Sequence, residues 1–320
     1  MSKIAYRSMS SATKTARARA EARFFWLKEI AIYLAEYLDF PRVNLPTFEV
    51  PNDPLHITMG LVEQIAQETR EYWNLGDGPI ADCVLLLENN GAVVSRGDLS
   101  AETLDAFSQW PADDPHPYVF LGADKNSAVR SRFDSLHELG HLILHRNVDP
   151  RVFRNKTVHR LIENQCHRYA SSFLLPASSF TNELWSPTLN AFLTLKPRWK
   201  AAIACMIKRS EELGILDDEM ARRMWINLNR RGWRKEEPLD DRLPVERPRL
   251  LSRSIVMLVE SGIKTKEQIL ADLALPAHDL ESLTGLPNGY FGSDAEMGMP
   301  KLKARGGSGR VVSIARGRQS

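Results

Sequence analysis

The sequence predicts an α+β fold, in which a small antiparallel sheet precedes a long helix and a mostly α-helical region follows. Three observations support this prediction. Short apolar segments typical of strands lie between residues 83 and 121, residues 132–145 have the pattern of one helix with apolar sides, and the last third of the chain has helical periodicity. With 320 residues, 43% of them hydrophobic, the chain is long enough for two globular domains.

The expected elements follow the chain in a simple order. Residues 13–37 and 55–73 have apolar positions at helical spacing, and a proline-rich connector separates them. The segment 83–96, with Asn89-Asn90-Gly91 at its centre, has the pattern of a β-hairpin. Further strands are expected near 106–110 and 118–121, and a turn at 124–129 should lead into the helix at 132–145. Later helices are expected at 159–173, 199–213, 217–231, 250–260, 265–273 and 277–283.

The composition also suggests where the domains divide. The two ends are rich in Lys and Arg, so the body between them is acidic despite a net charge of only +2. We interpret the ends as solvated tails and do not favour a nucleic-acid contact there. The expected segments are a basic N-terminus at 1–23, the sheet-containing domain at 24–185, a helix-turn-helix-like region at 186–236, a helical region at 237–290 and a basic disordered tail at 291–320.

Cysteine usage and hydropathy bear on the compartment. The three cysteines form no CxxC pair and no even framework, which is typical of a protein in the reducing cytosol. No apolar run reaches 18 residues, and no apolar segment follows the basic start of the chain. We therefore expect a cytoplasmic location and no membrane partner.

The segment 132–145 contains the pattern H-E-x-x-H. His137 and His141 are four residues apart, so both imidazoles leave one face of the helix, with Glu138 between them. Two imidazoles at this spacing can bind Zn²⁺, and the carboxylate can act as a general base. Gly140 costs about 1 kcal/mol inside a helix, a cost that is kept more readily where something must approach the backbone closely. The alternative is a helix that merely carries two surface histidines.

Catalytic zinc has three protein ligands, so a third is needed. The best candidate is Glu163, because a second helix returning after a loop can bring its carboxylate to the metal; the alternative is a solvated surface carboxylate. His145 lies on the face of His141 but about 11 Å along the axis from His137, too far to share one ion with both, and we expect it to support the ligands or the edge of the core. His167, one turn after Glu163, could orient that carboxylate or stabilise an oxyanion, and otherwise has a structural role, as does His159.

These residues also carry a family resemblance. The stretch RSRFDSLHELGHLILH, followed by IENQCHRYASSFLLP, resembles the ImmA/IrrE family of metallo-endopeptidases, and the similarity extends from about residue 26 to residue 287. The resemblance implies a zincin-like peptidase domain with Zn²⁺ held by His137, His141 and Glu163, and with Glu138 as the catalytic base. His167 stands where Asn is more usual in the family. No N-terminal XRE-type helix-turn-helix domain is evident.

The resemblance further implies a protein substrate, namely an XRE-type helix-turn-helix repressor cleaved in a stress or mobile-element response. Two alternatives remain open. The chain could be a non-catalytic regulatory or antitoxin-like binding module, or a DNA-binding regulator that uses the arginines of segment 217–231. An intact Glu138 favours the enzyme, since a structural metal site needs no base there. DNA contact is not favoured for the last helices because the segment 277–285 is acidic.

Overall fold

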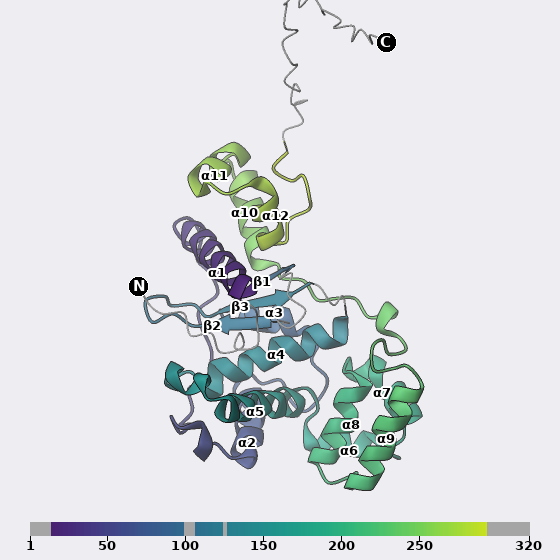
Figure 1. The fold of residues 1–320 in the computed structure, drawn as a ribbon. Coiled ribbons are helices and arrows are strands. Elements are labelled where there is room, and N and C mark those ends of the chain that lie inside the picture. Colours follow the sequence, from purple (N-terminus) through teal and green to yellow (C-terminus); the bar gives the residue numbers. More distant parts are fainter. Residues whose placement is uncertain (1–13, 99–105, 124–126, 293–320) are drawn as a thin grey trace, which may run out of the picture.

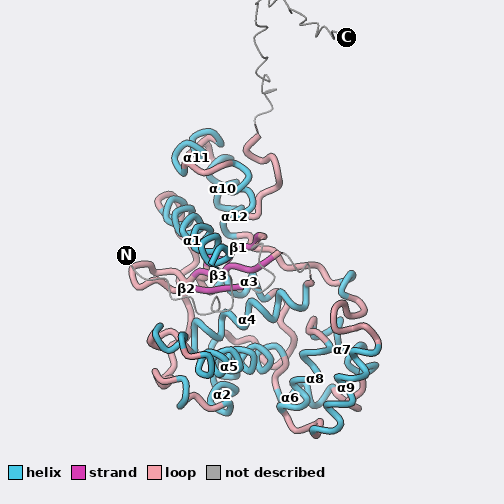
Figure 2. Tube along the Cα trace, in the orientation of Figure 1, coloured by secondary structure: helices cyan, strands magenta, loops and turns pink. Residues whose placement is uncertain are grey.

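The computed structural model describes residues 14–98, 106–123 and 127–292, so most of the basic N-terminus, the basic tail and part of the expected turn at 124–129 lie outside the described residues. Within them, α-helices surround a three-stranded sheet (Figures 1 and 2). The first half contains α1 (Lys14–Ala35), the 3-10 turn η2 (Pro54–His56), α2 (Met59–Tyr72), α3 (Cys83–Asn89), β1 (Val93–Gly97), β2 (Ala106–Gln109), β3 (Tyr118–Gly122) and α4 (Ala128–Leu144). The second half contains η3 (Pro150–Arg154), α5 (Lys156–Leu174), α6 (Ala177–Glu183), α7 (Leu189–Trp199), α8 (Ile203–Glu212), α9 (Asp218–Arg230), η4 (Asp240–Arg242), α10 (Leu250–Glu260), α11 (Lys266–Leu273) and α12 (Ala277–Thr284).

The sheet separates two hydrophobic cores. Its strand order is β1-β3-β2, with β1 parallel and β2 antiparallel to β3. Successive side chains of β3 point to opposite faces: Val119 lies in the core that contains α4, and Phe120 lies in the core that contains α1, α10 and α12. Figure 1 shows the same layering, with α4 on one side of the sheet and α1 and α10 on the other. Both faces are therefore covered, which explains why the strands are buried at nearly every position.

The α+β class is confirmed, but the β-hairpin predicted for residues 83–96 is wrong, and the sheet is mixed rather than purely antiparallel. The first half of that segment is helix α3, whose start is capped by the Asp82 side chain accepting from Leu85 N. Its buried residues Val84 and Glu88 recur at helical spacing. A short apolar run does not distinguish a buried strand from a buried helix by periodicity, so the surroundings decided.

Carboxylates from distant segments hold the starts of three helices. Glu246 accepts hydrogen bonds from the first two N–H groups of α3, Glu237 from those of α8, and Glu88 from the N–H groups of Arg249 and Leu250 at the start of α10. Neither α8 nor α10 has a side-chain cap of its own. These bonds satisfy N–H groups that a helix leaves unpaired at its start, and they favour the negative charge near the positive end of each helix.

The segment between α9 and α10 is thus attached to the helices around the sheet. Arg132 of α4 reinforces this attachment, because its buried guanidinium pairs with Glu246 and also donates to the carbonyls of Ile80 and Lys200. The main core likewise runs from Ile57 to Leu228 without a break between the helices before and after α6. Within the described part of the chain, none of the helices is long and apolar enough to span a bilayer.

Candidate metal centre

Helix α4 places the H-E-x-x-H residues at the centre of the molecule. His137, Glu138 and His141 are all buried, with 8%, 2% and 0% of their surface exposed. The helix packs directly on α5 at Gly140, where an added Cβ would lie 3.2 Å from Tyr169 Cδ1 and 3.4 Å from Cys166 Cα. The close approach expected at Gly140 is therefore present, and the approaching element is the helix that carries Glu163.

Glu163 faces both histidines from α5. Its Oε2 lies 3.3 Å from His137 Nε2, and its Oε1 lies 3.6 Å from His141 Nε2. Two ligand atoms of a tetrahedral zinc site, each about 2.05 Å from the ion, are about 3.3 Å apart. Both nitrogen–oxygen separations are close to this value, and two imidazoles with one carboxylate form a donor set typical of catalytic zinc. The residues present therefore fit a zinc ion.

One buried oxygen of the partly exposed Glu163 carboxylate gives a second reason for this fit. Its Oε1 is buried and accepts no hydrogen bond of good geometry from the described residues, although imidazole nitrogens lie 3.5–3.6 Å away. A buried carboxylate oxygen that is not hydrogen-bonded is costly unless a cation or another partner compensates its charge. A zinc ion between the carboxylate and the imidazoles would supply that compensation.

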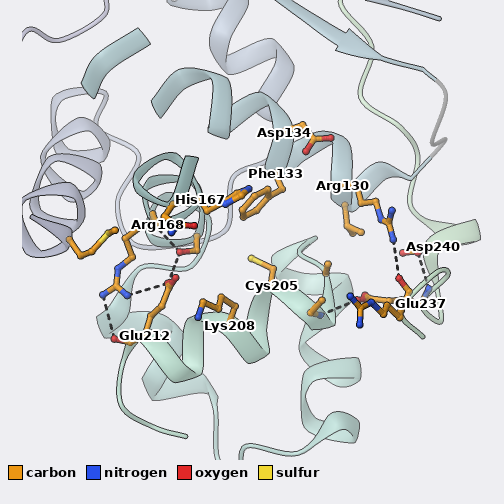
Figure 3. A pocket seen from close by; sticks show the side chains of 17 residues that line it. Arg130, Phe133, Asp134, His167, Arg168, Cys205, Lys208, Glu212, Glu237 and Asp240 are labelled. Atoms are coloured by element: carbon orange, nitrogen blue, oxygen red, sulfur yellow. Dashed lines mark hydrogen bonds and ion pairs between the residues drawn. The ribbon is translucent and has the colours of Figure 1, made fainter. Parts of the chain in front are cut away.

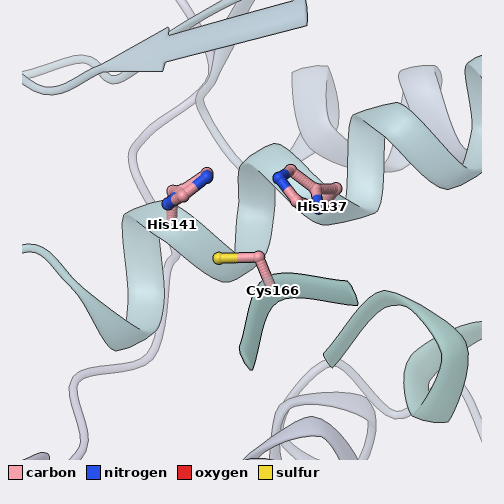
Figure 4. A group of neighbouring side chains, drawn as sticks. All are labelled: His137, His141 and Cys166. Carbon is pink, nitrogen blue, oxygen red and sulfur yellow. The ribbon is translucent and has the colours of Figure 1, made fainter. Parts of the chain in front are cut away.

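Cys166 offers a competing donor set with the same two histidines. One ligand atom each of His137, His141 and Cys166 lies within 4.8 Å of the others, and Figure 4 shows the sulfur below the two rings. The thiol, however, already contacts His145 Nδ1 at 3.4 Å. Glu163 also lies closer to both imidazole nitrogens than this 4.8 Å limit. By this geometry Glu163 is the better candidate for the third position, and Cys166 for a supporting one.

His145 is buried behind the site rather than in it. The side-chain amide of Gln165 donates to the carbonyls of Pro54 and Ile57, each at 2.8 Å. Its Oε1 therefore accepts from His145 Nε2 at 2.9 Å. His145 Nδ1 is then the acceptor, and Cys166 Sγ–H is the donor to it. In this arrangement the thiol donates to His145, whereas a zinc ligand must be a thiolate.

Glu138 has a hydrogen-bond partner on the sheet. Ser108 of β2 donates from Oγ to Glu138 Oε2 at 2.6 Å. Burial raises the pKa of Glu138 to about 7. The charge of His137 and the hydrogen bond from Ser108 act in the opposite direction and lower this pKa, but burial outweighs them. A carboxyl group whose pKa lies near neutrality is suited to accept a proton and return it in the same reaction cycle.

His167 and His159 border the site on either side of Glu163. The His167 ring lies 4.7 Å from the His137 ring and stacks on Phe133 at 5.8 Å, both between ring centroids. Burial, together with the neighbouring charge of His137, lowers the pKa of His167 to about 4, so its ring is neutral near pH 7. His159 Nε2 lies 3.5 Å from Glu163 Oε1. Both rings are thus placed to orient the carboxylate or contact a substrate.

The structure brings His137, Glu138, His141 and Glu163 together, with His167 at their border and His145 behind them. Sequence reasoning missed the contacts of Ser108 and Cys166. Cys166 follows Glu163 by three residues, so helical spacing could have placed it on the same face. Nothing in the sequence pairs Ser108 with Glu138, which lies thirty residues later.

The molecule combines a mixed sheet, a helix with an H-E-x-x-H motif beside it, and a carboxylate on the next helix. This combination defines a metallopeptidase domain of the zincin-like type. Comparison with known families agrees with this class. The family model Peptidase_M78, the IrrE N-terminal-like domain, matches residues 87–206, a span that contains every residue of the candidate centre. The match supports a metallopeptidase of the ImmA/IrrE family. No curated protein gives a significant match to the chain.

Proposed function

We propose that the protein is a zinc-dependent endopeptidase that cleaves a regulatory protein. The observation that carries this proposal is the convergence of His137, His141 and Glu163 beside the buried carboxyl group of Glu138. A purely structural zinc site takes four protein ligands and needs no adjacent base. Three ligands with a carboxyl group of raised pKa beside them favour catalysis.

The residues of the chain have separate tasks in hydrolysis. A zinc ion bound here would polarise the scissile carbonyl and make an attacking water more acidic. Ser108 occupies Glu138 Oε2 as a hydrogen-bond donor, which leaves Glu138 Oε1 as the atom that accepts the water proton. Glu138 then delivers this proton to the leaving amine, a role worth roughly 10²–10⁴-fold in rate. His167 borders the site as a neutral ring that can donate a hydrogen bond.

The position of β2 supports a polypeptide substrate. Among the described strands, β2 pairs only with β3, so its other side is an edge of the sheet. The same strand reaches the centre through the bond between Ser108 and Glu138. An extended peptide that paired with this edge would pass beside the catalytic carboxylate with its backbone aligned.

The identity of the substrate is the finer part of the proposal. The family resemblance favours a helix-turn-helix repressor of the XRE type, cleaved in a stress or mobile-element response. We do not propose DNA binding by α9, because Arg223 within the helix pairs with Glu219, and Arg231 at its end donates to Asn190.

The decisive experiment compares the parent with Glu138→Gln during co-expression with a candidate XRE-type repressor. Glutamine keeps the size of the side chain and can still bond to Ser108, but it cannot accept the water proton. We expect the variant to bind zinc and the repressor normally while repressor fragments, counted by mass spectrometry, fall by about 100-fold or more. Glu219→Gln, which removes an exposed carboxylate on α9, is the matched control and should cleave like the parent.

The alternative of a non-catalytic binding module predicts a different result. In that case Glu138→Gln would relieve repression as well as the parent does, and neither protein would produce fragments. This outcome would overturn the peptidase proposal.

A further inference from the structure

A cavity of about 700 Å³ lies next to the candidate metal centre. Helices α4, α5 and α8 form its walls, and the segment from Arg234 to Asp240 closes one end (Figure 3). A cavity of this size belongs to the range that holds drug-sized ligands or a few amino-acid side chains.

The cavity is continuous with the metal centre through one shared ring. His167 lines the cavity, and its ring lies 4.7 Å from the ring of the candidate ligand His137. A residue of an extended peptide spans about 3.5 Å. A side chain in the cavity would therefore belong to a substrate residue at, or directly next to, the scissile bond.

The charged groups around the cavity are largely committed to partners within the chain. Arg168 pairs with Glu63 on α2, and Glu237 holds Lys196 while it caps α8. Arg130 donates to two carbonyls of the segment after α9. Arg168 and Glu237 are thus paired with charges inside the chain, so these two groups offer an incoming charged side chain little compensation for losing its water.

Most of the remaining surface of the cavity is apolar, although Asp134, Lys208 and Arg234 also border it. Phe133, which stacks on His167, faces Cys205 of α8 across the cavity in Figure 3. Ala204, Val129 and Met59 also line the cavity. Small residues on α8 opposite an aromatic ring leave room for a bulky group. Burial of an apolar side chain against such a surface removes apolar area from water and is therefore favourable.

We propose that this cavity is a specificity pocket that binds a bulky apolar side chain, such as Leu, Met or Phe, of the substrate residue next to the scissile bond. The proposal deepens the peptidase function given above and rests on it. It names the chemical class of the anchor residue, because most of the surface of the pocket is apolar and charged lining residues such as Arg168 and Glu237 are paired within the chain.

The first test measures binding without any cleavage. Cys205 lines the cavity and is partly exposed, whereas Cys83 and Cys166 are buried, so N-ethylmaleimide should modify Cys205 first. Burial raises the pKa of the Cys205 thiol, so the reaction is followed at mildly alkaline pH by mass spectrometry. Capped pentapeptides Gly-Gly-X-Gly-Gly serve as probes, with X as Phe, Leu, Lys or Glu.

We expect the Phe and Leu peptides to slow the modification of Cys205 about tenfold at ten times their Kd, and the Lys and Glu peptides to have no effect. The buried Cys83 and Cys166 report any unfolding. Equal protection by the charged peptides, or no protection by the Phe peptide at about 10 mM, would overturn the proposal.

The second test fills the cavity. Ala204→Phe should lower the rate of cleavage next to large apolar residues by at least tenfold, whereas cleavage next to Ala or Gly should be unchanged. The control is Ala271→Phe, at an exposed alanine of α11, which should change neither rate. Thermal unfolding of both variants checks that they fold. An unchanged preference in a folded Ala204→Phe protein would refute the pocket, whereas absence of cleavage by the parent would refute the peptidase function and leave the cysteine protection test intact.

Discussion

Gly140 offers a sharp test of how α4 and α5 hold the metal centre. A methyl group added there would lie 3.2 Å and 3.3 Å from Tyr169 Cδ1 and Cβ, and 3.4 Å from Cys166 Cα. Ordinary contacts between carbon atoms are about 3.5–4.0 Å long. Gly140→Ala therefore requires α4 and α5 to move apart by a few tenths of an ångström, because Tyr169 is buried and the atom of Cys166 belongs to the backbone.

Two opposing effects set the size of the change. Replacing glycine by alanine inside a helix stabilises it by about 1 kcal/mol. Forcing an extra carbon into a packed interface costs about 1–3 kcal/mol. The free energy of unfolding should therefore fall by up to about 2 kcal/mol. Glu163 lies on α5 one turn before Cys166, so the same displacement should lengthen its distances to His137 and His141 and weaken zinc binding.

Urea unfolding and zinc competition with a chelator measure the two effects. Gly60→Ala is the matched control, because Gly60 lies in α2 and an added Cβ would meet only Thr58 Oγ1 at 3.9 Å. The control should be unchanged or stabilised by up to about 1 kcal/mol, with normal zinc affinity. If Gly140→Ala were stabilised as much as Gly60→Ala and bound zinc equally well, the close packing of α4 on α5 would not be what positions the ligands.

Three further predictions concern carboxylates and the thiol. Glu163→Ala should lose zinc on dialysis whereas Cys166→Ala should retain about one ion per chain, as measured by metal analysis. Glu63 is partly buried, which raises its pKa, but the hydrogen bond and charge of Arg209 outweigh burial, so the pKa is lowered overall. Its ionised form therefore stabilises the fold above the unfolded pKa of about 4.5, and this contribution is lost as pH falls through the folded pKa. In urea unfolding, Glu63→Gln should lower the free energy of unfolding by about 1–2 kcal/mol at pH 7 and by progressively less below pH 4.5. Glu237→Ala should lower the free energy of unfolding by about 3 kcal/mol, because a buried lysine and two N–H groups lose a partner.

Each of these outcomes has a control and a contrary result. Full zinc retention by Glu163→Ala would move the third ligand to Cys166 or another residue. A pH-independent difference between the parent and Glu63→Gln would show that the ionisation of Glu63 does not stabilise the fold. Glu219→Gln, at an exposed ion pair of α9, should change stability by less than about 0.5 kcal/mol, and a similar small effect of Glu237→Ala would mean that Asp240 alone can hold the lysine.

The helices that carry the candidate centre were predictable because their sequences are locally consistent. Residues 132–145 and 159–173 have helical periodicity, and the structure extends these helices to Ala128–Leu144 and Lys156–Leu174. The spacing of His137 and His141 fixes their common face in any α-helix. The cost of Gly140 in a helix likewise indicated a close approach before the approaching residue was known.

The hairpin prediction failed because the segment lacks the periodicity on which the helix predictions rested. The run at 83–88 is apolar at every position but its last, so it has no period to separate a strand from a helix. In the fold, Asp82 and Glu246 bond to the first N–H groups of α3 and favour the helix. Glu246 lies more than 160 residues away in sequence, so this stabilisation has no local signature.

The sequence by itself determined the class of fold, the helix with two imidazoles and a carboxylate, and a candidate third ligand. Tertiary structure alone decided which groups surround them: Ser108 on Glu138, His145 on Cys166, and the apolar cavity beside His167. The physical reason lies in the range of the interactions. Helical periodicity repeats within a few residues, whereas a buried carboxyl group or thiol is stabilised by whichever distant segment the fold brings within hydrogen-bond distance.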